Sequence, residues 1–193
     1  MPHVEDIIHR LVRLYEEMDQ TYTAAAGAAS LSCAECNGVQ CCTVDLILHT
    51  FGEMALLQRG FLELPFDVRC EIKDRARLVV SYRDRSPASE EYRNAVCAAN
   101  FEGNCMLYEY RPMICRLAGI PYQAVRPDGS VIRGSGCTRF QEAVQVAHPE
   151  LMIDRSQFYS DMAEIEIDAV RARRAKTPAR TMAELFHGFG LYQ

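Results

Sequence analysis

The sequence has no excess of positive charge and no apolar run long enough to cross a bilayer. Lysine and arginine number 21 against 26 aspartates and glutamates, which gives a formal net charge of -5 and argues against nucleic acid as the main partner. The longest charge-free run, residues 20–34, is too short and too polar for a transmembrane helix. The first residues have neither the basic nor the apolar region of a signal peptide. We therefore expect a cytoplasmic protein in a reducing environment, with neither nucleic acid nor membrane as a partner.

Cysteine is the residue that this sequence has in excess. The chain of 193 residues contains nine cysteines, and 49% of its residues are hydrophobic, so it can bury a core without a metal or disulfides to replace one. Disulfides are disfavoured in a reducing environment, and an odd number of cysteines leaves at least one unpaired in any disulfide scheme. Metal binding is the best explanation for so many thiols, and we expect it to involve eight of them: Cys33, Cys36, Cys41, Cys42, Cys97, Cys105, Cys115 and Cys137.

The first four of these cysteines have the spacing C-x2-C-x4-C-C. A C-x2-C pair such as Cys33 and Cys36 places two thiolates on one ion, and Gly38 lets the chain fold back toward Cys41 and Cys42. Side chains of neighbours in extended backbone point to opposite sides, so adjacent cysteines favour a polynuclear cluster or two separate sites over a single tetrahedral zinc. Burial of these cysteines as small hydrophobic side chains is the competing interpretation.

Eight thiols match two four-thiolate sites, one [4Fe–4S] cluster with four thiols left over, or one cluster plus one zinc. Neither ferredoxin spacing is present, and no H-x3–5-H follows as in a zinc finger. Because thiolate sites are anionic, they need compensating donors; arginines at positions 111, 116, 133 and 139 lie near Cys115 or Cys137, and we expect Arg111 and Arg116 to contact the cofactor. Cys70 lies apart from the other thiols and is left out of the site, whereas His49 could reach a metal.

Two segments make the chain similar to a known family. The run of residues 33–42 and the segment C-M-L-Y-E-Y-R-P-M-I-C-R at 105–116 resemble the YkgJ-type cysteine-cluster proteins, described as a CxxCxxCC zinc- or iron-chelating domain. Cys97 before the second segment, Gly136-Cys137 after it and Glu53 also match. The gap before the double cysteine is four residues here, longer than in the family's name.

The resemblance implies a protein that binds iron, as an iron–sulfur cluster, or zinc. A similar domain occurs in flagellin lysine N-methylases, which are thought to combine S-adenosylmethionine with an iron–sulfur cluster. This chain has neither a C-x3-C-x2-C radical motif nor a glycine-rich strand–helix turn. We therefore expect a [4Fe–4S] protein with a redox or S-adenosylmethionine-linked methyl-transfer role. The alternative is a zinc protein with a structural, interaction or chelating role and no catalysis.

Periodicity predicts a mainly α fold, a single helical domain over residues 1–193 with a small β-hairpin and cysteine-rich loops. We expect a helix at 3–28 and C-terminal helices within 138–187, packed on a cysteine region at about 33–137. The remaining expected elements are a helix opened by a Thr50–Glu53 capping box and ended by Gly60, a helix from Pro65, a helix from Ser86-Pro87 to about Cys97, a hairpin within 119–136, a helix opened by a Thr138–Gln141 capping box and stopped by Pro149, a helix at 154–176 and a short helix at 181–187. The apolar tail at 188–192 docks on the domain or forms an oligomer contact.

Overall fold

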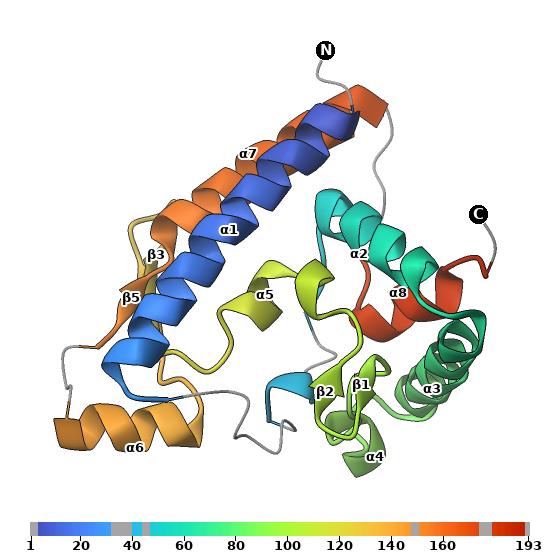
Figure 1. Ribbon diagram of the computed structural model, residues 1–193, viewed down its shortest axis with the longest axis horizontal. Coiled ribbons are helices and arrows are strands. Elements are labelled where there is room, and N and C mark those ends of the chain that lie inside the picture. The colour runs from blue at the N-terminus through green and yellow to red at the C-terminus, as the bar shows by residue number, and fades with distance from the viewer. Residues whose placement is uncertain (1–3, 32–39, 44–46, 148–150, 174–178, 192–193) are drawn as a thin grey trace. The chain divides into compact units, whose positions relative to one another are not determined.

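The computed structural model describes residues 4–31, 40–43, 47–147, 151–173 and 179–191 (Figure 1). The chain divides into two compact units, and each of them combines two separate stretches of sequence. Unit 1 comprises Met1–Cys36 and Met113–Arg174, and unit 2 comprises Asn37–Pro112 and Ala175–Gln193. The fold is mainly α, as predicted. The grouping of both units into one domain stays a prediction.

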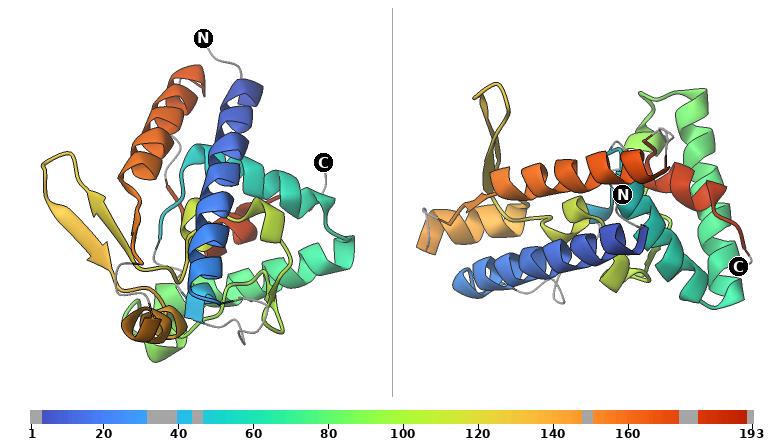
Figure 2. Two further views of the ribbon diagram at one scale, coloured as in Figure 1. Left: turned by 60° about the vertical axis from the view of Figure 1, so that its left-hand side comes forward. Right: turned by 90° about the horizontal axis from the view of Figure 1, so that it is seen from above.

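Unit 1 is built on two long helices that lie side by side, α1 (Val4–Ala28) and α7 (Ser156–Arg173) (Figures 1 and 2). The apolar positions that predicted both helices face the core: Ile7, Leu11, Leu14, Tyr15 and Met18 of α1 and Met162, Ile165 and Ala169 of α7 are buried. An ion pair joins the two helices, with Arg10 Nη1 at 2.6 Å from Asp168 Oδ2. The expected helix at 3–28 is thus confirmed.

A three-stranded sheet covers one end of these helices in unit 1. The predicted hairpin is present as β3 (Tyr122–Val125) and β4 (Val131–Gly134), which pair antiparallel. A third strand, β5 (Ile153–Asp154), pairs parallel to β3 and was not expected. It displaces the start of α7 to Ser156, whose N–H donates to Asp154 Oδ1 over 2.8 Å.

Two shorter helices complete unit 1, α5 (Met113–Arg116) and α6 (Thr138–Ala147). Helix α6 begins at Thr138, and the Gln141 side chain donates to Ser135 Oγ and the Gly136 carbonyl. The Thr138–Gln141 capping box stays a prediction. Pro149 lies outside the described residues. Buried Arg155 donates to the carbonyls of Leu117 and Ile120, and these bonds fix the chain that follows α5.

Unit 2 contains α2 (Phe51–Glu63), α3 (Phe66–Arg85), α4 (Glu90–Arg93) and α8 (Met182–Gly188). The Thr50–Glu53 capping box is confirmed, but α2 continues past Gly60. The Tyr110 ring packs so closely on Gly60 that no side chain fits there: a Cβ would lie 2.8 Å from Tyr110 Cδ1 and closer still to other ring atoms. The expectation that Gly60 ends the helix is therefore wrong.

The segment after α3 differs most from the prediction. Ser86 is the C-cap of α3 and does not start a helix; Ser89 caps the N-terminus of α4 by accepting the N–H of Tyr92 over 3.2 Å. The helix expected to run to about Cys97 therefore has only four residues. Beyond it the chain enters the short elements that carry cysteine.

The core of unit 2 is closed by aromatic side chains from the C-terminal segment. Phe61 of α2 lies 6.1 Å from Phe186 and 5.5 Å from Phe189, measured between ring centroids. Lys73 of α3 donates to the carbonyls of His187 and Phe189. The tail therefore docks within unit 2 at Phe189, and a further helix, α8, begins with the capping box of Thr181.

Four short elements of unit 2 hold the cysteine segments: η2 (Gln40–Cys42), β1 (Asn100–Phe101), β2 (Asn104–Cys105) and η3 (Tyr108–Tyr110). Strands β1 and β2 form a tight hairpin whose turn residues, Glu102 and Gly103, both have positive φ, 51° and 88°, as two-residue hairpin turns require. Figure 1 shows η2 beside this hairpin. Over the described ranges, no helix combines the length and the apolar composition needed to cross a membrane.

Candidate metal centre

The structure gathers four of the eight candidate cysteines in unit 2. Cys41 and Cys42 lie in η2, Cys97 precedes β1, and Cys105 ends β2. All four are reduced cysteines, with Cys41 exposed and the others half-buried. Cys33 and Cys36 lie outside the described residues, so the C-x2-C half of the expected site stays a prediction.

The adjacent pair, Cys41 and Cys42, lies in a 3₁₀ turn, not in the extended backbone assumed from the sequence. In this turn the two thiols reach each other, and a hydrogen bond from Cys41 is the largest effect on Cys42. Together with a side-chain hydrogen bond from Asn100 and the charge of Arg111, it outweighs burial and lowers the pKa of Cys42 from 9.0 to about 6. Cys42 is therefore a thiolate at neutral pH, the form that binds metal.

Cys97 and Cys105 are held next to Cys42 by backbone contacts. The Cys97 N–H donates to the Cys42 carbonyl over 2.7 Å, and the Cys97 carbonyl accepts the N–H of Asn100 over 2.9 Å. Asn100 is in turn the β1–β2 partner of Cys105. Burial raises the pKa of Cys105, opposed by a hydrogen bond from the Leu107 backbone, and the charge of Cys42 raises it further.

Arg111 supplies positive charge to this group of thiols. Its charge lowers the pKa of both Cys42 and Cys105, because a nearby positive charge favours the thiolate; its predicted contact with a cofactor stays a prediction. Its Nε donates to the Tyr108 carbonyl over 2.9 Å, and the guanidinium lies 3.4 Å from the centroid of the Tyr108 ring. The Tyr108 ring and carbonyl hold the guanidinium in place.

The other two described candidates, Cys115 and Cys137, belong to unit 1. The Cys137 N–H donates to the Gly119 carbonyl over 2.9 Å, and its side chain packs against the apolar cluster of Ile120 and Phe140. Gly119 has φ +86°, and a Cβ there would lie 3.2 Å from the Cys137 sulfur. Cys137 thus has the surroundings of a core side chain, and its role as a ligand stays a prediction, as does that of Cys115.

Arg116 is nearly fully buried in unit 1 and has partners there. Its Nη1 pairs with Asp19 Oδ2, and its guanidinium lies 4.2 Å from the centroid of the Tyr15 ring. Both contacts join α5 to α1. They give Arg116 a structural role, while its predicted contact with a cofactor stays a prediction.

Two further residues weighed from the sequence have partners within unit 2. Buried His49 places Nδ1 at 3.7 Å from Glu53 Oε2, and its N–H donates to the Arg180 carbonyl over 3.0 Å. Glu53, the glutamate that matches the family, is the capping-box residue of α2 and stabilises the start of that helix. Cys70 lies on α3 and is half-buried. Burial lowers the pKa of the neighbouring Lys73, and the charge of Cys70 opposes this effect only in part.

Cys42 interacts with two other thiols, through a hydrogen bond with Cys41 and through its charge with Cys105. Among the residues that the structure places, no group of three or more cysteine, histidine, aspartate or glutamate side chains is arranged to hold a metal ion. The donor chemistry nevertheless fits a thiolate centre, because Cys42 is ionised, Cys105 lies within its field, and Arg111 offsets the charge. Soft thiolates select zinc, copper(I) and iron–sulfur clusters.

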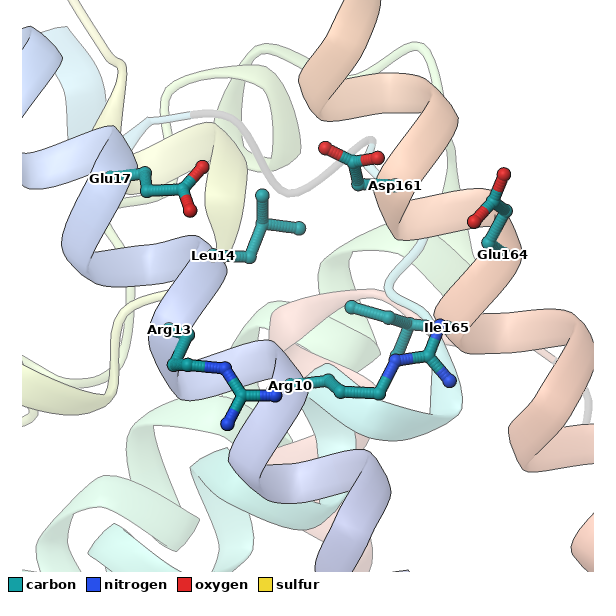
Figure 3. Close-up of a pocket in the computed structure, with 7 residues that line it drawn as sticks. All are labelled: Arg10, Arg13, Leu14, Glu17, Asp161, Glu164 and Ile165. Atoms are coloured by element: carbon teal, nitrogen blue, oxygen red, sulfur yellow. The ribbon is translucent and has the colours of Figure 1, made fainter. Parts of the chain in front are cut away.

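Unit 1 contains a groove of about 200 Å³ that has no cysteine in its lining (Figure 3). Two arginines and three carboxylates surround an apolar floor, and the lining residues are Arg10, Arg13, Leu14, Glu17, Asp161, Glu164 and Ile165. Arg10 also pairs with Asp168, and the Arg10 charge holds the pKa of that carboxyl below its usual range. All of these charged residues belong to the two packed helices α1 and α7.

Sequence reasoning missed Asn100, which the structure places among the cysteines. Asn100 is only 7% exposed, and its side chain hydrogen-bonds Cys42. A signal was present in the sequence, since an asparagine and the turn pair Glu102-Gly103 lie between two cysteines. The hairpin register that brings Asn100 opposite Cys105 was not evident from that pattern.

No family model matches the chain, and no curated protein or solved structure matches it either. The resemblance to the YkgJ-type cysteine-cluster family therefore stays a prediction that rests on the residues named above.

Proposed function

We propose that this protein binds a metal centre through cysteine thiolates, and that unit 2 provides the described part of the site. Cys41, Cys42, Cys97 and Cys105 are its ligands in unit 2, and the C-x2-C pair of Cys33 and Cys36 stays a prediction from the sequence. The observation that carries the proposal is the set of contacts around Cys42: the Cys41 thiol and the Asn100 side chain hydrogen-bond it, and with the charge of Arg111 they lower its pKa to about 6. A thiolate at neutral pH binds a soft metal without first losing a proton.

We favour an iron–sulfur cluster, with zinc as the alternative. The sequence offers six thiols at positions 33–42, 97 and 105, more than the four that a single zinc takes. A cluster would supply electron transfer, or, with S-adenosylmethionine, the methyl-transfer chemistry suggested by the resemblance. Arg111 would offset the negative charge of the bound centre, and the Leu107 N–H, which hydrogen-bonds Cys105, would donate to one of its sulfurs.

Purification without exposure to air tests both versions. The protein is expressed with iron and zinc supplied, purified anaerobically, and analysed for metal and acid-labile sulfide together with its visible spectrum. Iron and sulfide in equal amounts with a brown colour support the cluster. Colourless protein with stoichiometric zinc supports the alternative, and protein without either metal refutes the proposal.

A cysteine series then identifies the ligands. Serine replaces Cys42 in one variant and Cys70 in another, because both are half-buried thiols of unit 2 but only Cys42 lies in the proposed site. We expect Cys42→Ser to lose metal and Cys70→Ser to keep it. Equal retention in both variants would place the metal elsewhere.

A further inference from the structure

Asn100 connects three of the candidate cysteines. Its N–H donates to the Cys97 carbonyl over 2.9 Å, its Cα lies opposite that of Cys105 in the hairpin, and its side chain hydrogen-bonds Cys42. Asn100 is only 7% exposed. A buried amide that loses its hydrogen-bond partners is destabilising, so these contacts determine where the side chain lies.

A second contact fixes which end of the amide faces the sulfur. The N–H of Gly103 donates to Asn100 Oδ1 over 3.0 Å. Because the oxygen is the acceptor for the turn, the amide nitrogen is left to donate. The Cys42 sulfur therefore accepts a hydrogen bond from Asn100 Nδ2.

The backbone of Asn100 is anchored to helix α3. Arg75 Nη1 donates to the Asn100 carbonyl over 2.8 Å, and its guanidinium lies 4.1 Å from the centroid of the Phe101 ring. Glu71 holds the same guanidinium by an ion pair of 2.6 Å. Helix α3 therefore holds the main chain of Asn100 in place through Arg75, and this positions the side-chain amide.

We propose that Asn100 is a positioning residue of the cysteine site, which fixes the Cys42 sulfur by donating an N–H to it and withdraws charge from that sulfur when a metal is bound. This inference rests on the proposed function. Residues that hydrogen-bond metal ligands orient them and tune the bound metal. Asn100 would therefore affect both the affinity for metal and, for an iron–sulfur cluster, the reduction potential.

The hydrogen bond is tested first in metal-free full-length protein by NMR of the side-chain amides. We expect one Asn100 Nδ2 proton to resonate well downfield of its partner and to exchange slowly with solvent, and Cys42→Ala to abolish both effects. This variant leaves Asn100 unchanged. Two ordinary amide protons in the wild-type protein would overturn the inference, whether or not the protein binds metal.

Metal affinity is tested with Asn100→Asp, and Asn104→Asp is the matched control. Aspartate keeps the oxygen that accepts the Gly103 N–H but turns an acceptor toward the sulfur. Asn104 lies in the same hairpin, next to Cys105, and is exposed, so its substitution adds the same charge near the site and controls for charge alone. Cobalt(II) is the probe, followed by its sulfur-to-metal charge-transfer band in competition with a chelator.

We expect Asn100→Asp to weaken cobalt binding about 10-fold to 100-fold and Asn104→Asp to leave it unchanged. Equal affinity in Asn100→Asp and wild type refutes the inference while the proposed function stands. Wild-type protein that shows no charge-transfer band refutes the proposed function instead, and the NMR measurement then decides by itself whether Asn100 fixes Cys42.

Discussion

Thiol–disulfide exchange in the metal-free protein should separate Cys42 from Cys105 by the pH at which each begins to react. The pKa of Cys42 is lowered to about 6, first by the hydrogen bond from Cys41, whereas burial raises the pKa of Cys105 above 9.0. Because the thiolate is the reacting species, the rate at Cys42 should rise through about pH 6 and reach a plateau below pH 8. The rate at Cys105 should still be rising at pH 9.

The size of the effect depends on the pH chosen. At pH 7 a thiol of pKa 6 is about 90% ionised and one of pKa 9 about 1%, roughly a 90-fold difference. A thiolate of lower pKa is also a weaker nucleophile, with a Brønsted coefficient of about 0.4–0.5. Over three pKa units this reduces the rate at the more acidic thiol by about 15-fold to 30-fold. Cys42 should therefore react only about 3-fold to 6-fold faster than a thiol of pKa 9 at pH 7, but about 15-fold to 35-fold faster at pH 6.

The assay uses a short exposure to a small disulfide reagent over a range of pH, an acid quench and mass spectrometry of the cysteine peptides. Cys41→Ala removes the hydrogen-bond donor and should move the midpoint of Cys42 upward, whereas Cys41→Ser keeps an O–H donor and should retain a low midpoint. A midpoint for Cys42 in wild-type protein near that of an ordinary thiol would refute the proposed thiol contact. So would equal midpoints in the two Cys41 variants.

The same pKa shift gives Cys42 a defined effect on stability. Its pKa is lower in the folded chain than the ordinary value of 9.0, so ionisation stabilises the folded state. The contribution is complete above about pH 9, declines as the pH falls toward 6, and is lost below it. A metal bound at Cys42 would keep it ionised to lower pH.

Three sets of substitutions test the packing through the free energy of unfolding in denaturant. Gly60→Ala should destabilise by about 1–3 kcal/mol because its Cβ meets the Tyr110 ring, while Gly27→Ala, with nothing within 4 Å, should stabilise by up to about 1 kcal/mol; effects of the same sign would contradict the packing argument. Phe61→Ala removes a side chain with no exposed surface and should cost about 3–5 kcal/mol, so a loss below 1 kcal/mol would exclude its core position. Thr181→Ala removes the N-cap of α8 and should cost about 0.5–2 kcal/mol, and an unchanged midpoint would argue against the cap.

Local signals in the sequence predicted most of the helices. The apolar spacing of α1 and α7 and the capping box at Thr50 each depend on residues within a few turns of one another. The structure confirms those elements within a few residues. The hairpin of β3 and β4 was also predictable, because its turn lies between its two strands.

Contacts between distant residues account for the errors. Gly60 lies inside α2, where its lack of a side chain makes room for the ring of Tyr110, fifty positions later, and no local pattern carries that information. Strand β5 depends on pairing with β3, and its two residues are too few for a sequence signal. The same limit applies to the site, since Asn100 and Cys42 lie far apart in the sequence and meet only in the folded chain.

The surroundings of the sulfurs divide the cysteines more clearly than their spacing does. The sulfur of Cys42 is met by donors and positive charge from Cys41, Asn100 and Arg111, and that arrangement stabilises an anion. The sulfur of Cys137 instead packs against Gly119 and an apolar cluster, as a small hydrophobic side chain does. The first kind of environment stabilises a thiolate even before a metal binds, because hydrogen bonds and nearby positive charge favour the charged form. The η2 turn and the β1–β2 hairpin of unit 2 are therefore the place to test for the proposed metal centre.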